Sequence, residues 1–196
     1  MSMEDMKSVL VNFNMQTGLS SKWDSIRRNL SAMGGMFADE AKHAEMVEQD
    51  DVLVYEFYDS GRPERPGEVA FGTSITYPGK VGDEYFMTKG HFHTILETAE
   101  VYYCLRGHGY MLMENPEGDW EAQELKPGLA VYVPERYAHR SINVSDSEPL
   151  ITFYAFRGDA GHDYGTIETK GFRKLIVERE GKPEIIDNPK WAGEME

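Results

Sequence analysis

The chain has 196 residues, of which 40% are hydrophobic and 28% charged, and its formal net charge is -14. This composition is typical of one folded domain and excludes a disordered or fibrous chain. The acidic balance argues against nucleic acid and anionic membranes as partners, because both attract basic surfaces. An anionic metabolite can still bind where a cation or backbone amides supply local positive charge.

The single cysteine, Cys104, excludes an intrachain disulfide and favours a reducing compartment, so we expect a cytoplasmic protein. Its neighbours in the sequence YYCL predict a buried thiol. The beginning of the chain, MSMEDMKSVL, does not have the basic and apolar segments of a signal peptide. No run of residues approaches the ~20 apolar positions that a membrane span needs. We therefore expect no membrane partner.

Two helical patterns come first along the chain. In residues 20–33 the apolar residues Trp23, Ile26, Leu30 and Met33 recur at spacings of three and four, with serine available as the N-cap and glycine at the end. Residues 39–51, DEAKHAEMVEQDD, predict a second and more exposed helix. We expect His43 of this helix to face solvent. Residues 1–51 are thus predicted to be a helical segment that packs on the rest of the chain.

The pattern changes at residue 52 to short β-branched and aromatic runs separated by turn residues. Eight such runs, about ten residues apart, predict a sandwich or barrel and not alternating βαβ units. The turns fall at residues 77–84, 115–119 and 126–128. We expect a mainly β protein with a single β-barrel over residues 52–188 and a tail over residues 189–196, all in one structural domain. The runs are VLVYEFY, VAFGTSITY, EYFMTKGHFH, EVYYCLRGHGYMLM, LAVYVP, HRSINV, LITFYAF and FRKLIVERE.

The sequence GHFHTILETAEVYYCLRG contains two histidines and a carboxylate that suit a metal ion. Alternate residues of a strand share a face, so His91 and His93 can converge on one point. If the next strand pairs with this one as a hairpin, Glu100 at its start lies beside both histidines. Glu97 is a rival ligand, but it lies in the turn, where it would face water. Alternatively, the two histidines are polar residues on a half-exposed strand.

A third histidine, His139, begins a strand after a tight connection in GLAVYVPERYAHRSINV. Three imidazoles and one carboxylate make a mixed nitrogen and oxygen shell that suits Fe(II), Mn(II), Ni(II), Zn(II) or Co(II). A six-coordinate ion in this shell keeps positions open for substrate or water.

These residues resemble the two motifs of the cupin family. In that family the motifs line one end of a small β-barrel and supply the metal ligands, which would here be His91, His93, Glu100 and His139. Arg136 stands where the second motif usually has glycine. The residues that carry the resemblance are His91, His93, Glu100 and Gly107 for the first motif and Gly128, Pro134, His139 and Asn143 for the second.

Four longer strings resemble a narrower group, the cupin-type phosphoglucose isomerases of archaea and some bacteria. The resemblance covers the chain from about residue 52 to its end, and its strings are PGKVGDEYFMTKGHFH, ETAEVYYCLRGHGYMLMENPEGDW, PGLAVYVPERYAHRSIN and DAGHDYGTI. It implies an intramolecular oxidoreductase that interconverts glucose 6-phosphate and fructose 6-phosphate in glycolysis and gluconeogenesis. It further implies one divalent metal per chain, Fe(II) first, and a homodimer whose seam includes the apolar face of an N-terminal segment.

The same resemblance assigns roles to particular residues. It implies catalysis by Glu100, His139 and Tyr102, with Glu100 as both a metal ligand and the base that moves a proton through a cis-enediol. A direct hydride shift stays open as the competing route. Ser74 stands where the family has threonine, and Phe156 where it has tyrosine. The implied sugar phosphate contacts are Tyr55, Ser74, Thr88, Gly90, Tyr102, His162 and Tyr164.

Plainer interpretations and other functions stand beside this one. On the pattern alone, Tyr55 and Tyr102 could be core residues, and Lys89 could be either a charge partner for phosphate or a solvated side chain. A cupin oxygenase would use the same ligands for O₂ chemistry. Ser74, Thr88 and Gly90, the implied phosphate contacts, would then have no role in the reaction. A cupin that only binds a sugar or a metal is the third alternative.

Overall fold

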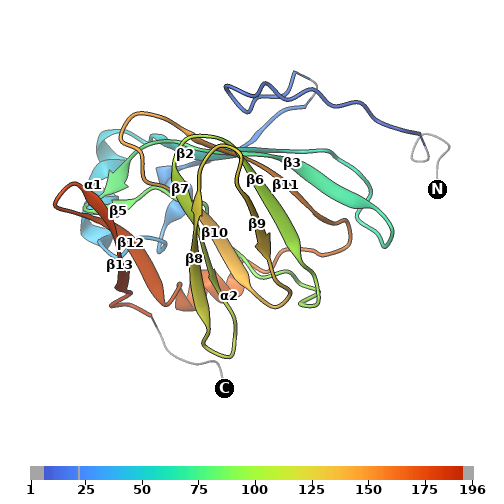
Figure 1. Cartoon of the computed structure of the whole chain (residues 1–196). Helices are drawn as coiled ribbons and strands as arrows, with labels where there is room; N and C mark the ends of the chain where they lie inside the picture. The colour runs from blue at the N-terminus through green and yellow to red at the C-terminus, as the bar shows by residue number, and fades with distance from the viewer. Residues whose placement is uncertain (1–6, 22, 192–196) are drawn as a thin grey trace.

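The computed structural model describes residues 7–21 and 23–191, and strands make up most of its regular structure (Figure 1). Two α-helices and one 3-10 helix accompany the strands in these residues. The elements are β1 Ile26–Asn29, η1 Leu30–Met33, α1 Glu40–Gln49, β2 Leu53–Asp59, β3 Val69–Thr76, β4 Lys80–Val81, β5 Glu84–Tyr85, β6 Glu100–Arg106, β7 Gly109–Glu114, β8 Trp120–Leu125, β9 Ala130–Val133, β10 Ala138–Asn143, β11 Leu150–Arg157, α2 Gly165–Lys170, β12 Lys174–Arg179 and β13 Lys182–Asp187.

The strands form three antiparallel sheets. A six-stranded sheet has the order β1-β2-β3-β11-β6-β9, and a three-stranded sheet has the order β10-β7-β8. A four-stranded sheet, β13-β12-β5-β4, lies beside α1 at one side of the molecule (Figure 1). The predicted mainly β architecture is confirmed. The hydrogen bonds, however, join the strands into separate sheets that face one another and not into one closed ring.

Strand β6 shows why the sheet has a buried and an exposed face. Its residues alternate, so that Glu100, Tyr102 and Cys104 are buried while Val101 and Tyr103 are exposed. The thiol of Cys104 is buried as predicted, and its burial raises the pKa to about 11. The buried face of β6 thus supplies both core residues and the polar residues of a cavity.

The predicted turns at residues 115–119 and 126–128 and most of the predicted strands are confirmed, but residues 77–84, predicted as a loop, contain β4 and the first residue of β5. The turn at residues 115–119 connects β7 and β8, and the predicted run at residues 100–113 proves to be two strands, β6 and β7. Strand β8, with the sequence WEAQEL, was not predicted, because half of its residues are polar and only Leu125 is buried, which is the pattern of a solvated edge strand. Helix α2 was also missed; it has six residues, too few for a helical period to stand out.

The predicted helix over residues 20–33 is wrong. The segment contains strand β1, which pairs antiparallel with β2, followed by the short 3-10 helix η1. Of the apolar stripe, Leu30 and Met33 are buried, but Ile26 remains 44% exposed. The three-and-four spacing therefore did not mark a single buried face, and main-chain hydrogen bonds to β2 determined the local structure instead.

The second predicted helix is confirmed as α1. Asp39 caps it by accepting a hydrogen bond from the Lys42 backbone N–H at 2.8 Å. The expectation for His43 is wrong, because its ring stacks on Phe37 and its Nε2 donates to the Leu30 carbonyl at 2.8 Å. Neither helix of the described part of the chain has the length and apolar character of a membrane span.

Candidate metal centre and adjoining cavity

Three imidazoles and one carboxylate meet at a single point inside the molecule. One ligand atom from each of His91, His93, Glu100 and His139 lies within 4.8 Å of the other three. Glu100 Oε2 lies 2.9 Å from His139 Nε2 and 3.2 Å from His93 Nε2. All four side chains are buried, whereas the rival carboxylate of Glu97 is exposed to solvent, as predicted.

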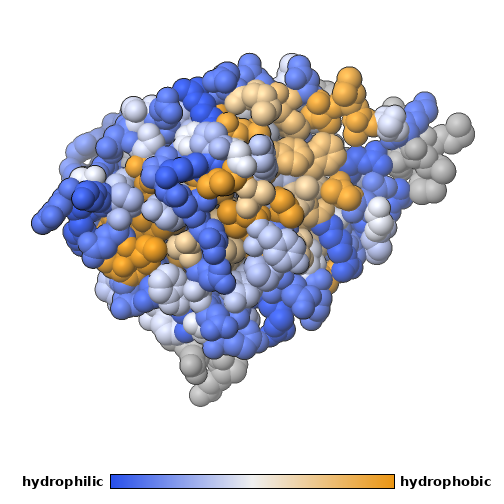
Figure 2. Space-filling model, viewed as in Figure 1, coloured by the Kyte–Doolittle hydropathy of each residue, from blue (hydrophilic) through white to orange (hydrophobic). Residues whose placement is uncertain are grey.

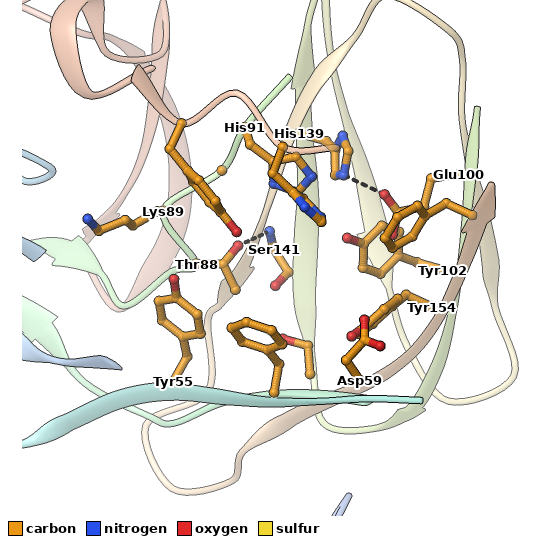
Figure 3. A pocket seen from close by; sticks show the side chains of 16 residues that line it. Tyr55, Asp59, Thr88, Lys89, His91, Glu100, Tyr102, His139, Ser141 and Tyr154 are labelled. Carbon is orange, nitrogen blue, oxygen red and sulfur yellow. Dashed lines mark hydrogen bonds and ion pairs between the residues drawn. The ribbon is translucent and has the colours of Figure 1, made fainter. Parts of the chain in front are cut away.

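The backbone brings these residues together differently from the predicted hairpin. The histidine segment does not pair with β6 but with β10, where His91 and His139 exchange backbone hydrogen bonds of 3.3 and 3.1 Å. Strand β6, which carries Glu100, pairs with β11 and β9 in the six-stranded sheet. The carboxylate therefore reaches the histidines across the interior, from a different sheet (Figure 3).

Backbone carbonyls fix the orientation of two of the imidazoles. His93 Nδ1 lies 3.1 Å from the Thr98 carbonyl, and His139 Nδ1 lies 3.3 Å from the Tyr137 carbonyl. A carbonyl oxygen only accepts, so Nδ1 donates in both cases, and the neutral form of each imidazole then has its lone pair on Nε2. Each Nε2 faces the common point, which is the arrangement that a metal-binding histidine needs.

The charge states of the cluster also suit a metal. Burial alone would raise the pKa of Glu100, but His139 and His93 outweigh this effect and hold the pKa at about 2. Burial, followed by the neighbouring histidines, lowers the pKa of His91 well below its usual value. An ionised carboxylate and a neutral imidazole are the forms that bind a divalent cation.

An ion at this point would satisfy atoms that otherwise have no regular hydrogen bond. In the described residues, Nε2 of all three histidines and Oε2 of Glu100 are buried without a hydrogen-bond partner of good geometry. Burying such atoms unsatisfied is costly, and four of them at one point is a pattern that a bound cation explains. The donor set therefore fits a metal ion.

A cavity opens beside the cluster, and every residue predicted to contact the sugar phosphate lines it (Figure 3). Tyr55 and Asp59 lie at opposite sides of this cavity, below the histidines. The lining residues are Tyr55, Phe57, Asp59, Ser74, Thr88, Lys89, Gly90, His91, Glu100, Tyr102, His139, Ser141, Tyr154, Phe156, His162 and Tyr164.

Hydroxyl groups and a cation surround one part of the cavity. Thr88 and Ser141 bind each other twice, because Thr88 N–H donates to the Ser141 carbonyl at 3.0 Å and Ser141 N–H donates to Thr88 Oγ1 at 3.1 Å. Ser74 Oγ is buried and has no hydrogen-bond partner in the described residues. Lys89 lines the cavity but also pairs with Glu168 at 2.6 Å, so it is neither free nor simply solvated.

The DAGHDYG loop forms another wall. The His162 ring lies 4.4 Å from the His91 ring, measured between centroids, and stacks on the Tyr164 ring at 5.8 Å. A backbone bridge between Phe92 and Asp163 ties the loop to the histidine segment. His162 is exposed to solvent and also lines the cavity, so it stands at the opening.

Phe156 takes the place of the expected tyrosine and stacks on the His93 ring at 5.4 Å. No phenol is available there to a substrate. Tyr154, two residues earlier on the same face of β11, also lines the cavity, and its hydroxyl donates to the Tyr58 carbonyl at 2.9 Å. Phe156 thus forms an apolar wall behind the candidate ligand His93.

Sequence reasoning missed several lining residues that a simple rule could have found. On β2, Phe57 and Asp59 follow Tyr55 at alternate positions and share its face. Ser141 follows His139 at the alternate position on β10 for the same reason. Asp59 is the notable omission, because apart from Glu100 it is the carboxylate that the cavity lining contains.

The family model described as Glucose-6-phosphate isomerase (GPI) matches residues 27–191. A glucose-6-phosphate isomerase of Pyrococcus furiosus is 46% identical over 181 residues, which are 92% of this chain and 95% of the relative. One from Thermococcus litoralis is 48% identical over the same shares, and one from Sinorhizobium medicae is 37% identical over 91% of this chain and 85% of the relative.

Similarity to solved structures extends over about half of the chain. An oxalate oxidase in complex with the substrate analogue glycolate aligns with a TM-score of 0.42 and 13% identity, over 50% of this chain and 47% of that chain. The family match and the curated relatives, by contrast, span nearly all of the sequence that forms the metal cluster and the cavity. The chain belongs to the glucose-6-phosphate isomerase family.

Proposed function

We propose that this chain is a metal-dependent aldose-ketose isomerase that interconverts glucose 6-phosphate and fructose 6-phosphate, in glycolysis and gluconeogenesis. The observation that carries the proposal is one cavity whose lining combines hydroxyl groups with three of the four converging candidate ligands, His91, Glu100 and His139. A sugar phosphate needs both parts, because its phosphate requires hydrogen-bond donors and its reacting carbons require an acid-base group beside a cation.

The four ligands would hold one divalent ion per chain, with Fe(II) as the first candidate and Mn(II), Ni(II), Zn(II) and Co(II) as alternatives. The mixed set of His91, His93, Glu100 and His139 supports this choice, since imidazole and carboxylate suit all of these ions. When bound, such an ion supplies Lewis acidity that stabilises negative charge on the sugar oxygens.

Glu100 is the proposed base. Its ionised carboxylate takes a proton from C2 of the aldose as the enediol forms, and it returns the proton to C1 as the ketose forms. Burial, followed by the charge of Glu100, raises the pKa of Tyr102 well above its usual value. The phenol therefore stays protonated and donates to a sugar oxygen. His139, whose Nε2 lies 2.9 Å from the Glu100 carboxylate, would complete the catalytic group by sharing the metal ion with it.

The phosphate is proposed to bind at Tyr55, Ser74, Thr88 and Gly90. The buried Ser74 hydroxyl without a partner supports this placement, because a phosphate oxygen would satisfy it. Burial raises the pKa of Tyr55 to about 12, so its phenol remains a donor at neutral pH. His162 and Tyr164 would close the opening over the sugar, whereas Asp59 would repel a phosphate and so favour binding in one orientation.

A coupled assay tests the activity. Metal-stripped protein, reloaded with each ion in turn, should convert fructose 6-phosphate to glucose 6-phosphate, detected through a dehydrogenase. The same reaction run in D₂O distinguishes the enediol route from the hydride shift. A proton that moves through an enediol exchanges with solvent, so deuterium enters the product. A hydride shift involves no exchange with solvent and leaves the product unlabelled. No turnover with any of the five ions would reject the isomerase.

The association of two chains is proposed as well. Three apolar residues on the outer face of β6 and β9, Val101, Tyr103 and Tyr132, and Leu129 just before β9 are 41 to 63% exposed, and we call these four residues the outer patch. Val101 and Tyr132 are direct neighbours across the two strands. Hydrophobic residues gather over this region in Figure 2, and the ring of Phe13 in the N-terminal segment contacts Phe153 on the adjoining strand β11. Such a patch supports a homodimer.

Two further parts of the proposal concern the whole chain. We assign the protein to the cytoplasm, which the single and buried Cys104 supports. We also assign residues 1–51 and the barrel of residues 52–188 to one structural domain, with residues 189–196 as a tail; residues 1–6, 22 and 192–196 of these ranges lie outside the described part of the chain. Leu30, Met33 and Phe37 support this assignment, because they belong to the same buried cluster as Phe86 and Phe172 of the barrel.

A further inference from the structure

A buried arginine lies directly behind the cavity. Arg140 is on β10 between His139 and Ser141, whose side chains both reach the cavity. Because neighbouring residues of a strand point to opposite faces, Arg140 projects away from the cavity and into the protein, where it is only 2% exposed. Arginine is rarely buried to this extent unless its charge and its hydrogen-bond donors are paired with other groups.

Its guanidinium group binds the segment that leads into the histidines. Nη2 donates to the Lys89 carbonyl at 2.8 Å, and Nη1 contacts Met87 Sδ at 2.8 Å. The group also stacks over the Phe172 ring, 4.0 Å from its centroid. The guanidinium is a cation at neutral pH, because arginine keeps its proton in proteins.

Through the geometry of the peptide bond, the contact between Arg140 and the Lys89 carbonyl also sets the direction of the Gly90 N–H. In a trans peptide the carbonyl and the following N–H point in opposite directions, and the described chain contains no cis peptide. Because the Lys89 carbonyl points to Arg140, the N–H of Gly90 points the other way, to the side where Gly90 lines the cavity. A hydrogen bond to the carbonyl also polarises the amide and strengthens the N–H as a donor.

Gly90 itself is adapted to this arrangement. Its φ of 77° lies in the left-handed region, and a Cβ there would lie 2.7 Å from the Phe172 ring and 3.0 Å from the His139 carbonyl. The Phe172 ring that excludes the Cβ is the ring on which Arg140 stacks. Arg140, Phe172 and Gly90 therefore form one packed unit beneath the cavity.

We propose that Arg140 is a positioning residue that holds the Lys89–Gly90 peptide so that the Gly90 N–H faces the substrate phosphate. This inference rests on the proposed function, in which Gly90 contacts that phosphate. It accounts for anion binding by a chain with a net charge of -14. The Lys89 ammonium is paired with Glu168, so much of the local positive potential must come from oriented amides.

The test measures phosphate binding apart from turnover. In metal-loaded protein, Arg140→Met should weaken binding of inorganic phosphate, measured by calorimetry, by about tenfold, because one well-placed donor is lost. The KM for fructose 6-phosphate should rise by a similar factor, while kcat and the metal content per chain change little. Arg140→Lys should recover only part of the affinity, since an ammonium does not reproduce the two-pronged contact.

Arg173→Met is the matched control. Its guanidinium stacks on Trp191, 4.2 Å from the ring centroid, and Arg173 does not line the cavity. This variant should keep the phosphate affinity of the parent protein, even if its Tm falls. Arg140 also lines a second cavity, between residues 35–38 and α2, through which a small cation can enter. Millimolar guanidinium should therefore restore phosphate binding to Arg140→Ala.

Two results would overturn the proposal. The first is a folded, metal-loaded Arg140→Met protein whose phosphate affinity and KM stay within twofold of the parent values. The second is a parent protein that does not bind phosphate at all. A parent protein that binds phosphate but does not isomerise its sugar substrate would count against the proposed function alone, because calorimetry still measures the effect of Arg140.

Discussion

At the scale of single residues, the orientation of two of the three imidazoles depends on a neighbour that is not itself a candidate ligand. The Thr98 and Tyr137 carbonyls bind Nδ1 of His93 and His139 and leave Nε2 to face the cluster. The same two histidines lower the pKa of Glu100 against the effect of burial. Groups outside the cluster therefore help to orient the side chains that would hold a cation.

Glu100→Gln should lower kcat by about 10²–10⁴, because the amide cannot accept the proton while its size and shape are retained. Its far-ultraviolet circular dichroism should match that of the parent. Glu97→Gln is the matched control, since Glu97 is exposed and outside the cavity lining, and it should leave the rate unchanged. Equal rates for Glu100→Gln and the parent protein would remove Glu100 from the mechanism.

Loss of a group that only supports a ligand typically weakens metal affinity by ~10–100-fold. His139→Ala removes a candidate ligand itself, so it should weaken metal retention by more than this factor. The measurement is metal content after dialysis against a weak chelator. His108→Ala is the control, because His108 contacts Glu124 at the surface and takes no part in the cluster. Full metal content in both variants would show that the ligand set is wrong.

At the scale of elements, the site depends on strands that lie far apart in the sequence. The histidine segment is bound to β10, and Glu100 arrives on β6 from the facing sheet. Behind β10, the short strand β5 carries Glu84 into the core, where the carboxylate is 3% exposed and accepts a hydrogen bond from the Ala38 N–H at 2.8 Å. Burial raises the pKa of Glu84 to about 7.

This pKa predicts a pH dependence of stability. The folded value of about 7 lies above the ordinary value of 4.5, so the folded state binds the proton more tightly than the unfolded state. The stabilisation of the folded state by protonated Glu84 is fully present below pH about 4.5 and is lost as the pH rises through about 7. In urea unfolding, this loss should be at most about 3 kcal/mol.

Glu84→Gln removes the titration and keeps an oxygen for the Ala38 N–H. As the pH rises from 5 to 8, the parent protein should therefore lose free energy of unfolding that the variant retains. The variant thus gains stability relative to the parent over this range. Glu184→Gln, on the exposed side of β13, should show no such shift. A difference between Glu84→Gln and the parent that is constant across this range would contradict the assignment.

At the scale of the whole molecule, the six-stranded sheet contributes residues both to the cavity and to the outer patch. The inner residues of β6 reach the cavity, and its outer residues belong to the outer patch. Association through the outer patch would cover apolar area on the same strand that carries Glu100, and so would stabilise the strand that presents the carboxylate.

Val101→Lys combined with Tyr132→Lys should convert a dimer into a monomer, because buried like charges would face each other across a symmetric seam. Sedimentation at several concentrations measures the result. Ile185→Lys, which adds a charge at an exposed apolar position on β13, should leave the dimer intact. A parent protein that sediments as a monomer throughout would exclude the dimer.

The sequence by itself determined the residue types, the candidate ligands and most of the strands. Alternation along β6 predicted that Glu100, Tyr102 and Cys104 share a face, and this holds because the strand period is local. The residues that line the cavity could be named in advance where they fall in recognisable motifs, as His162 and Tyr164 do.

Only the tertiary structure decided which strands meet. No local pattern shows that the histidine segment pairs with β10, that residues 26–29 add an edge strand instead of a helix, or that Arg140 lies behind the cavity. These features depend on hydrogen bonds and packing between residues far apart in the chain. Spacing along the sequence carries no information about those contacts, because the free energy that selects them belongs to the folded arrangement as a whole.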